Sequence, residues 1–93
     1  MASPIAHYDI KVKGRVQGVG YRAFAAATAR SFNLNGFVKN LVDGSVLVEA
    51  EGPSDLLDQF VLECKKGPGW AYVDGVTVIE STIQGFKEFK VRY

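Results

Sequence analysis

The chain has 93 residues, a formal net charge of +1 and a hydrophobic content of 47%. This size predicts one domain spanning residues 1–93, with residues 1–5 as a flexible tail, and the composition favours a packed core over disorder. The near-zero net charge argues against a nucleic-acid partner, which needs a basic surface. The N-terminus does not resemble a signal peptide, and no apolar run reaches the roughly 20 residues of a membrane helix. We therefore expect a cytoplasmic monomer with no nucleic-acid or membrane partner.

The first predicted elements are a strand, a loop and a helix. Residues 8–12 alternate between apolar and polar side chains, which is typical of a half-buried strand, and Gly14 ends it. His7 falls on the polar face of this strand, so we expect no catalytic role for it. The helix is predicted over residues 21–33 from the helical spacing of Phe24, Ala25, Thr28 and Phe32.

A hairpin and a second helix follow. The Asp43-Gly44 pair between the apolar runs 37–41 and 45–51 predicts two strands joined by a tight turn. The Gly-Pro-Ser-Asp sequence at 52–55 is typical of a helix start, and Lys-Lys-Gly-Pro at 65–68 is typical of a helix end. Between them, apolar residues recur at helical spacing: Leu57, Phe60, Val61 and Cys64.

Two more strands complete the predicted order. Residues 73–83 are rich in β-branched side chains, and Phe89, Val91 and Tyr93 alternate with polar residues in a short last strand. Because each helix has one apolar stripe, both helices should pack on one face of an antiparallel sheet. The expected fold class is α+β, a ferredoxin-like βαββαβ sandwich with a short extra C-terminal strand. This fold supports many functions, so the activity has to be inferred from the site.

The most informative motif is the loop KGRVQGVGYR at 13–22. Its glycines let the backbone bend and offer N–H groups to an anion, and the helix behind it directs the positive end of its dipole to the same place. Arg22 adds a guanidinium that matches phosphate oxygens. An ordinary glycine loop followed by a solvated arginine is the alternative interpretation. The predicted phosphate-binding residues are Arg15, Val16, Gln17, Gly18, Val19, Gly20 and Tyr21, together with Arg22.

A second block supports phosphate chemistry: Gly36-Phe-Val-Lys-Asn40, followed by Asp43-Gly44. Together with the loop, this block resembles the acylphosphatase family in order and spacing, and the resemblance runs from the first strand to the fourth. It implies hydrolysis of a small-molecule acyl phosphate to carboxylate and inorganic phosphate, without a metal or any other cofactor. By position, it assigns phosphate binding to Arg22 and positioning of the attacking water to Asn40. Inorganic phosphate or sulfate would be competing ligands.

The sequence departs from the family pattern at three aromatic positions. Phe37 stands where the family often has tryptophan, and Tyr21 where it often has phenylalanine; both changes concern packing more than chemistry. Trp70 stands where smaller or polar residues are usual, and it either lines the acyl side of the site or packs on the surface. We expect the strand of Asn40 to neighbour the first strand, so that the two blocks meet at one pocket.

Three other functions are compatible with the fold in general. A regulatory domain that binds phosphate or another anion without turnover would use the same loop, and it is the main alternative. An RNA-binding domain would need exposed aromatic residues on a basic sheet, whereas the strand at 45–51 carries Glu49 and Glu51 and no aromatic residue. A metal chaperone would need paired cysteines, but Cys64 is the only cysteine and is expected in the core.

Overall fold

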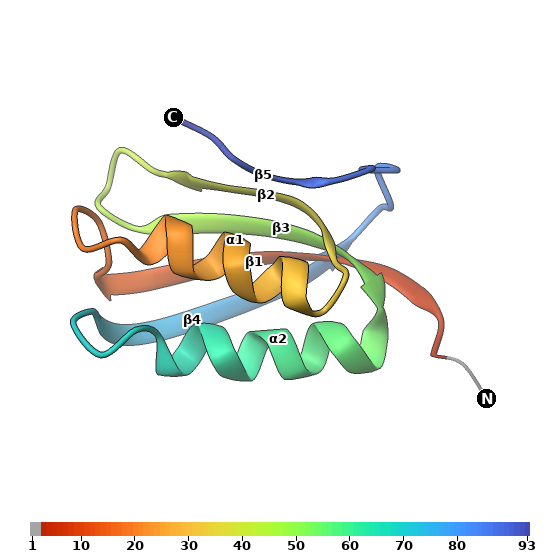
Figure 1. Ribbon diagram of the computed structural model, residues 1–93, viewed down its shortest axis with the longest axis horizontal. Coiled ribbons are helices and arrows are strands. Elements are labelled where there is room, and N and C mark those ends of the chain that lie inside the picture. Colours follow the sequence, from red (N-terminus) through yellow and green to blue (C-terminus); the bar gives the residue numbers. More distant parts are fainter. Residues whose placement is uncertain (1–2) are drawn as a thin grey trace.

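The computed structural model describes residues 3–93 and contains a five-stranded sheet with two helices (Figure 1). The predicted order of elements is confirmed. In chain order they are β1 (Ile5–Arg15), α1 (Tyr21–Ser31), β2 (Asn35–Asn40), β3 (Val46–Pro53), α2 (Ser54–Lys66), β4 (Tyr72–Ser81) and β5 (Phe89–Val91).

The first strand begins earlier than the alternation predicts. Ile5 already belongs to β1, where it pairs with Pro53 at the end of β3. The Ser54 N–H also donates to the Pro4 carbonyl at 2.9 Å. Of the predicted tail 1–5, Ile5 is therefore a strand residue, and residues 1–2 lie outside the described residues.

The sheet has the strand order β4-β1-β3-β2-β5. Its β1–β3, β1–β4 and β2–β3 pairs are antiparallel, as predicted, whereas β5 runs parallel to β2. The strand of Asn40, β2, is not a neighbour of β1 as expected, because β3 lies between them. The connection through α1 places β2 two positions away from β1 in the sheet. The next strand, β3, then returns antiparallel into the position between them.

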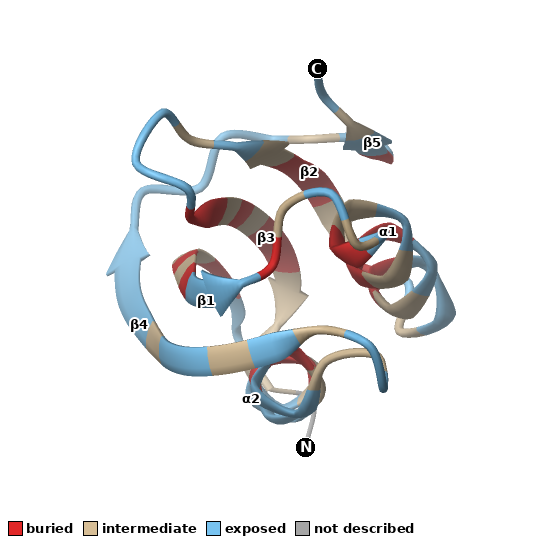
Figure 2. Cartoon of the chain, turned by 90° about the vertical axis from the view of Figure 1, so that its left-hand side faces the viewer, coloured by how far each residue is buried: buried red, intermediate tan, exposed pale blue. Residues whose placement is uncertain are grey.

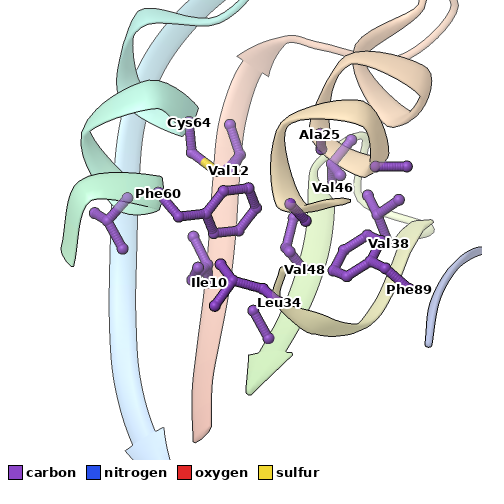
Figure 3. Close-up of a cluster of buried hydrophobic side chains, with 14 of the residues drawn as sticks. Ile10, Val12, Ala25, Leu34, Val38, Val46, Val48, Phe60, Cys64 and Phe89 are labelled. Carbon is purple, nitrogen blue, oxygen red and sulfur yellow. The ribbon is translucent and has the colours of Figure 1, made fainter. Parts of the chain in front are cut away.

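Both helices cover the same face of the sheet, and the core lies between the two layers (Figures 1 and 3). Helix α1 packs over β2 and β5, and α2 packs over β1, β3 and β4. In each strand every second side chain points into this layer, because successive side chains of a strand point to opposite faces of the sheet. Fully buried members labelled in Figure 3 are Ile10, Val12, Ala25, Val38, Val46, Val48, Phe60 and Cys64. Within the described part of the chain, no helix is long and apolar enough to cross a membrane.

A buried hydrogen bond joins the start of α1 to the end of α2. The Tyr21 hydroxyl donates to the Cys64 carbonyl at 2.7 Å, and both residues are almost completely buried. That carbonyl would normally accept the N–H of the residue four positions on, but this residue is Pro68, which has none. Tyr21 therefore satisfies an acceptor that the helix itself leaves open. Burial raises the pKa of Tyr21, so that its hydroxyl remains a donor.

The Tyr21→Phe variant is expected to lower the free energy of unfolding by about 1–2 kcal/mol, because it leaves the buried Cys64 carbonyl without a donor. Chemical denaturation followed by circular dichroism measures the change. Tyr72→Phe is the matched control, since the Tyr72 side chain is 65% exposed and loses the same atom. Equal stability of the two variants would contradict the role given to the Tyr21 hydroxyl.

The opposite face of the sheet is covered in part by the connector of residues 82–88 between β4 and β5. Figure 2 shows it as a pale-blue segment on the side of the sheet away from α1. His7 lies on this side, the polar face to which the alternation assigned it, but it is fully buried. Its ring lies 5.9 Å from the ring of Phe86 in the connector and its Nδ1 lies 2.7 Å from a Glu51 carboxylate oxygen. The alternation correctly assigned His7 to this face, but it could not reveal that a later segment covers it.

Candidate active site

The site is built at the junction between β1 and α1. Gly18 (φ 74°) and Gly20 (φ 79°) both have left-handed backbone conformations, which glycine adopts without strain. Gly20 is the N-cap of α1 and makes no side-chain capping bond, while its carbonyl accepts the Phe24 N–H at 3.1 Å. The N–H groups of the first-turn residues before Phe24 have no acceptor within the helix. The junction thus presents backbone donors and the positive end of the helix dipole at one point.

A small pocket of about 190 Å³ opens at this junction. It is smaller than the pockets that hold drug-sized ligands and is suited to an anion with a short substituent. Arg22 and Asn40 both line it, although β2 and α1 are separate elements. The complete lining is Val16, Gly18, Gly20, Tyr21, Arg22, Ala23, Asn40, Val91 and Tyr93.

The structure brings together most of the predicted phosphate-binding residues. Val16, Gly18, Gly20 and Tyr21 line the pocket, whereas Arg15, Gln17 and Val19 do not. The Val16 and Tyr21 side chains are buried in the core, so only their backbone atoms remain available to a ligand. The exposed Arg15 lines a different hollow with Gly14, Tyr72 and Asp74.

Gln17 holds the loop against the turn between β2 and β3. Its Nε2 donates to the Leu41 carbonyl at 2.7 Å and to the Ser45 carbonyl at 2.8 Å. The turn is braced from the other side, where Lys11 lies 2.9 Å from Asp43. Hydrogen bonds from Lys11 and Ser45 hold the pKa of Asp43 well below its usual range. Gln17 therefore acts on the geometry of the site, because Leu41 directly follows Asn40.

Trp70 touches the loop from the outside. Its indole Nε1 donates to the Val19 carbonyl, and its side chain is 71% exposed. It is not among the residues that line the pocket. Of the two interpretations offered by the sequence, surface packing describes its position, with one added hydrogen bond to the loop.

The C-terminal segment supplies a wall of the pocket that sequence reasoning missed. The Arg22 Nη1 donates to the Arg92 carbonyl at 2.8 Å, and the guanidinium lies 4.6 Å from the centre of the Tyr93 ring. The Arg92 N–H donates in turn to the Val38 carbonyl at 2.8 Å, which continues the parallel pairing of β5 with β2. The alternation at residues 89–93 indicated a strand but gave no sign of its neighbour.

Arg22 keeps donors for a ligand after this contact. A guanidinium carries five N–H donors, and only one of its nitrogens, Nη1, donates to the Arg92 carbonyl. Its stacking on Tyr93 restrains the side chain at the pocket. Asn40, at the last position of β2, has an exposed side chain at the same pocket. The arrangement provides a cation, backbone donors and a neutral amide around a space of anion size.

Fold and site together define the class of protein: an α+β domain of the ferredoxin-like type with a glycine loop at the start of its first helix. A family model for acylphosphatase matches residues 8–91. The chain is 50% identical over 80 residues to the acylphosphatase of Thermus thermophilus, which covers 86% of this chain and 91% of that protein. The crystal structure of acylphosphatase from Bacillus subtilis superposes with a TM-score of 0.92 at 42% identity, covering 95% of this chain and 99% of that one.

The chain belongs to the acylphosphatase family, and the resemblance seen in its motifs is confirmed. A further match is the structure of T. kodakarensis HypF, with a TM-score of 0.81 and 34% identity. It covers the whole of this chain but only 12% of that one. The same fold is therefore also found as a small part of a much longer protein.

Proposed function

We propose that this protein is a phosphohydrolase that cleaves acyl phosphates into a carboxylate and inorganic phosphate. The observation that carries the proposal is that Arg22, Asn40 and the glycine loop line one small pocket. The loop N–H groups of residues 15–20, the start of α1 and Arg22 would hold the phosphoryl oxygens. Asn40 would position the water for attack on phosphorus.

The proposed reaction makes modest demands on the protein. Water forms a bond to phosphorus while the bond from phosphorus to the acyl oxygen breaks, and the carboxylate leaves with its electron pair. Phosphoryl transfer through a loose transition state is promoted mainly by positioning and by stabilisation of charge on the phosphoryl oxygens. Because a carboxylate is a good leaving group, no general acid is required.

Asn40 contributes by position and not by basicity. A neutral amide is not a base near neutral pH, but its oxygen accepts a hydrogen bond from water and can hold that water in line with the bond that breaks. The proton released by the water goes to a phosphate oxygen of the substrate. Positive charge comes from Arg22 and the helix dipole, so we expect turnover to continue in the presence of a chelator.

The purified protein is expected to hydrolyse benzoyl phosphate in buffer containing EDTA. The measurement is the release of benzoate or inorganic phosphate above the spontaneous rate. Inorganic phosphate and sulfate should inhibit competitively, because they present the same oxygens to the pocket. Absence of turnover at micromolar enzyme, with a native circular dichroism spectrum, would contradict the proposal.

The alternative is a domain that binds phosphate without hydrolysing acyl phosphates. The match to a small part of HypF shows that the fold also occurs within a longer chain. Calorimetry with inorganic phosphate separates the two functions when it is combined with the assay. Phosphate binding without turnover would support the binding domain, whereas binding with turnover supports the enzyme. We also propose that the protein is a monomer, which equilibrium sedimentation would test.

A further inference from the structure

A compact group of titratable side chains lies on the face of the sheet opposite the helices. Its centre is His7, which is fully buried. The His7 Nε2 lies 2.9 Å from Asp9 Oδ1 and 3.0 Å from Glu49 Oε1, and Nδ1 lies 2.7 Å from Glu51 Oε2. The proposed hydrolysis uses none of these residues. By strand register, Asn40 of the phosphate pocket is level with Val12, and five residues of extended strand, about 17 Å, separate Val12 from His7.

The charges of this group do not balance among its own members. Even with a protonated imidazole, three carboxylates surround one positive charge, which leaves a net charge of −2. Lys11 is the next residue on this face of β1, but it is paired with Asp43 at 2.9 Å. Arg92 and Lys39 also lie toward this face, but both sit at the Phe37 ring, with the Arg92 guanidinium 3.8 Å and the Lys39 Nζ 5.8 Å from the ring centre. An additional cation would therefore relieve repulsion between the carboxylates.

The positions of three atoms suit a metal ion. The ligand atoms offered by His7, Asp9 and Glu49 all lie within 4.8 Å of one another. An octahedral ion with bonds of about 2.1 Å places neighbouring ligands about 3.0 Å apart. The distances of 2.9 and 3.0 Å from Nε2 to the two carboxylate oxygens match that spacing. The side chains of Asp9 and Glu49 are 35% and 24% exposed, so an ion can reach them and keep water ligands.

Glu51 gives the imidazole the orientation that a metal ligand needs. Its carboxylate accepts the N–H groups of Gly85 at 3.0 Å and Phe86 at 2.9 Å, and that of Gln84 as well. A carboxylate fixed in this way keeps a proton on His7 Nδ1, so Nε2 is the nitrogen that can bind an ion. Histidine ligands in metal sites commonly donate their other N–H to such a carboxylate.

We propose that His7 Nε2, Asp9 and Glu49 bind a divalent transition-metal ion, with Glu51 as the partner that orients His7. Imidazole with carboxylates suits Zn²⁺, Co²⁺ or Mn²⁺ better than Ca²⁺ or Mg²⁺. The ion would join β1 to β3 and, through Glu51, to the connector of residues 82–88. Its role would be structural, since none of its ligands lines the phosphate pocket.

The test is titration of the metal-free protein with Co²⁺ and Zn²⁺. His7 is the only histidine and the only cysteine is buried, so ligand signals have a single assignment. We expect visible Co²⁺ absorption bands, a shift of the His7 ring signals in the NMR spectrum, and an increase in Tm. At a Zn²⁺ concentration of 100 times Kd, the increase should be about 14 °C.

Asp9→Asn and Glu49→Gln are each expected to weaken binding at least tenfold, and Glu51→Gln by about 10–100-fold. Glu80→Gln is the matched control, because it removes the same charge from β4 opposite Tyr8 and should leave binding unchanged. A Co²⁺ spectrum equal to that of the free ion, with no shift of His7, would overturn the proposal and leave only a hydrogen-bonded imidazolium. Equal binding by Asp9→Asn, Glu49→Gln and Glu80→Gln would overturn it as well.

Discussion

The Arg22→Ala variant is expected to reduce kcat/KM for benzoyl phosphate by about 10³-fold or more. Among residues 3–93, Arg22 is the only cationic side chain that lines the pocket, and its guanidinium is held there by the Arg92 carbonyl and the Tyr93 ring. It contacts phosphoryl oxygens in the bound substrate and in the transition state. Its loss should therefore raise KM and lower kcat together. Steady-state kinetics over a wide substrate range measures both.

Two further variants make the Arg22 experiment specific. Arg22→Lys keeps the positive charge but loses the planar pair of donors, so we expect an activity between those of the native protein and Arg22→Ala. Lys65→Ala removes an exposed cation near the end of α2 and serves as the control for net charge. Both Arg22 variants should retain the native circular dichroism spectrum. Native values of kcat and KM in Arg22→Ala would contradict the assigned phosphate site.

The Asn40→Ala variant is expected to reduce kcat by about 10²–10³-fold with little change in KM. The reason is that Asn40 would hold the attacking water, which contributes to the transition state and not to binding of the phosphoryl group. Affinity for inorganic phosphate, measured by calorimetry, should stay within about twofold of the native value. The two variants therefore separate the roles, because Arg22→Ala loses binding and rate, and Asn40→Ala loses rate alone.

Asn35→Ala is the matched control for Asn40→Ala. Asn35 is the same residue type at the opposite end of the same strand, and it does not line the pocket. Its variant should retain native kcat. If Asn40→Ala also retained native kcat, the water-positioning role would be wrong even though the protein remained an acylphosphatase.

The parts of the fold that depend on local sequence were predicted well. The hairpin around Asp43-Gly44 and the two helices follow from short patterns, since turn chemistry and helical periodicity act over a few residues. The loop at 13–22 is also local, because it lies between a strand and the helix that follows it. Arg22 was therefore identified as a candidate from this loop, and Asn40 from the resemblance to the acylphosphatases; the structure places both at one pocket.

The features that were missed depend on contacts between distant segments. The parallel pairing of β5 with β2 joins residues more than fifty positions apart, and it brings Tyr93 to Arg22. The burial of His7 depends on the connector of residues 82–88, which no pattern in the first strand could reveal. Alternation reports the face on which a side chain lies, but it does not report what later covers that face.

Because β5 has only three residues, its stability affects the fraction of molecules in which the pocket is complete. A short edge strand opens more readily than the central strands, so its stability is local and lower than that of the whole domain. When the end of β5 separates from β2, Arg22 loses the Arg92 carbonyl and the Tyr93 ring, whereas Phe89 is held in the core. The fraction of molecules competent for binding is then set by the opening equilibrium of one edge strand. Affinity for phosphate could consequently change with substitutions in β5 that leave the midpoint of global unfolding unchanged.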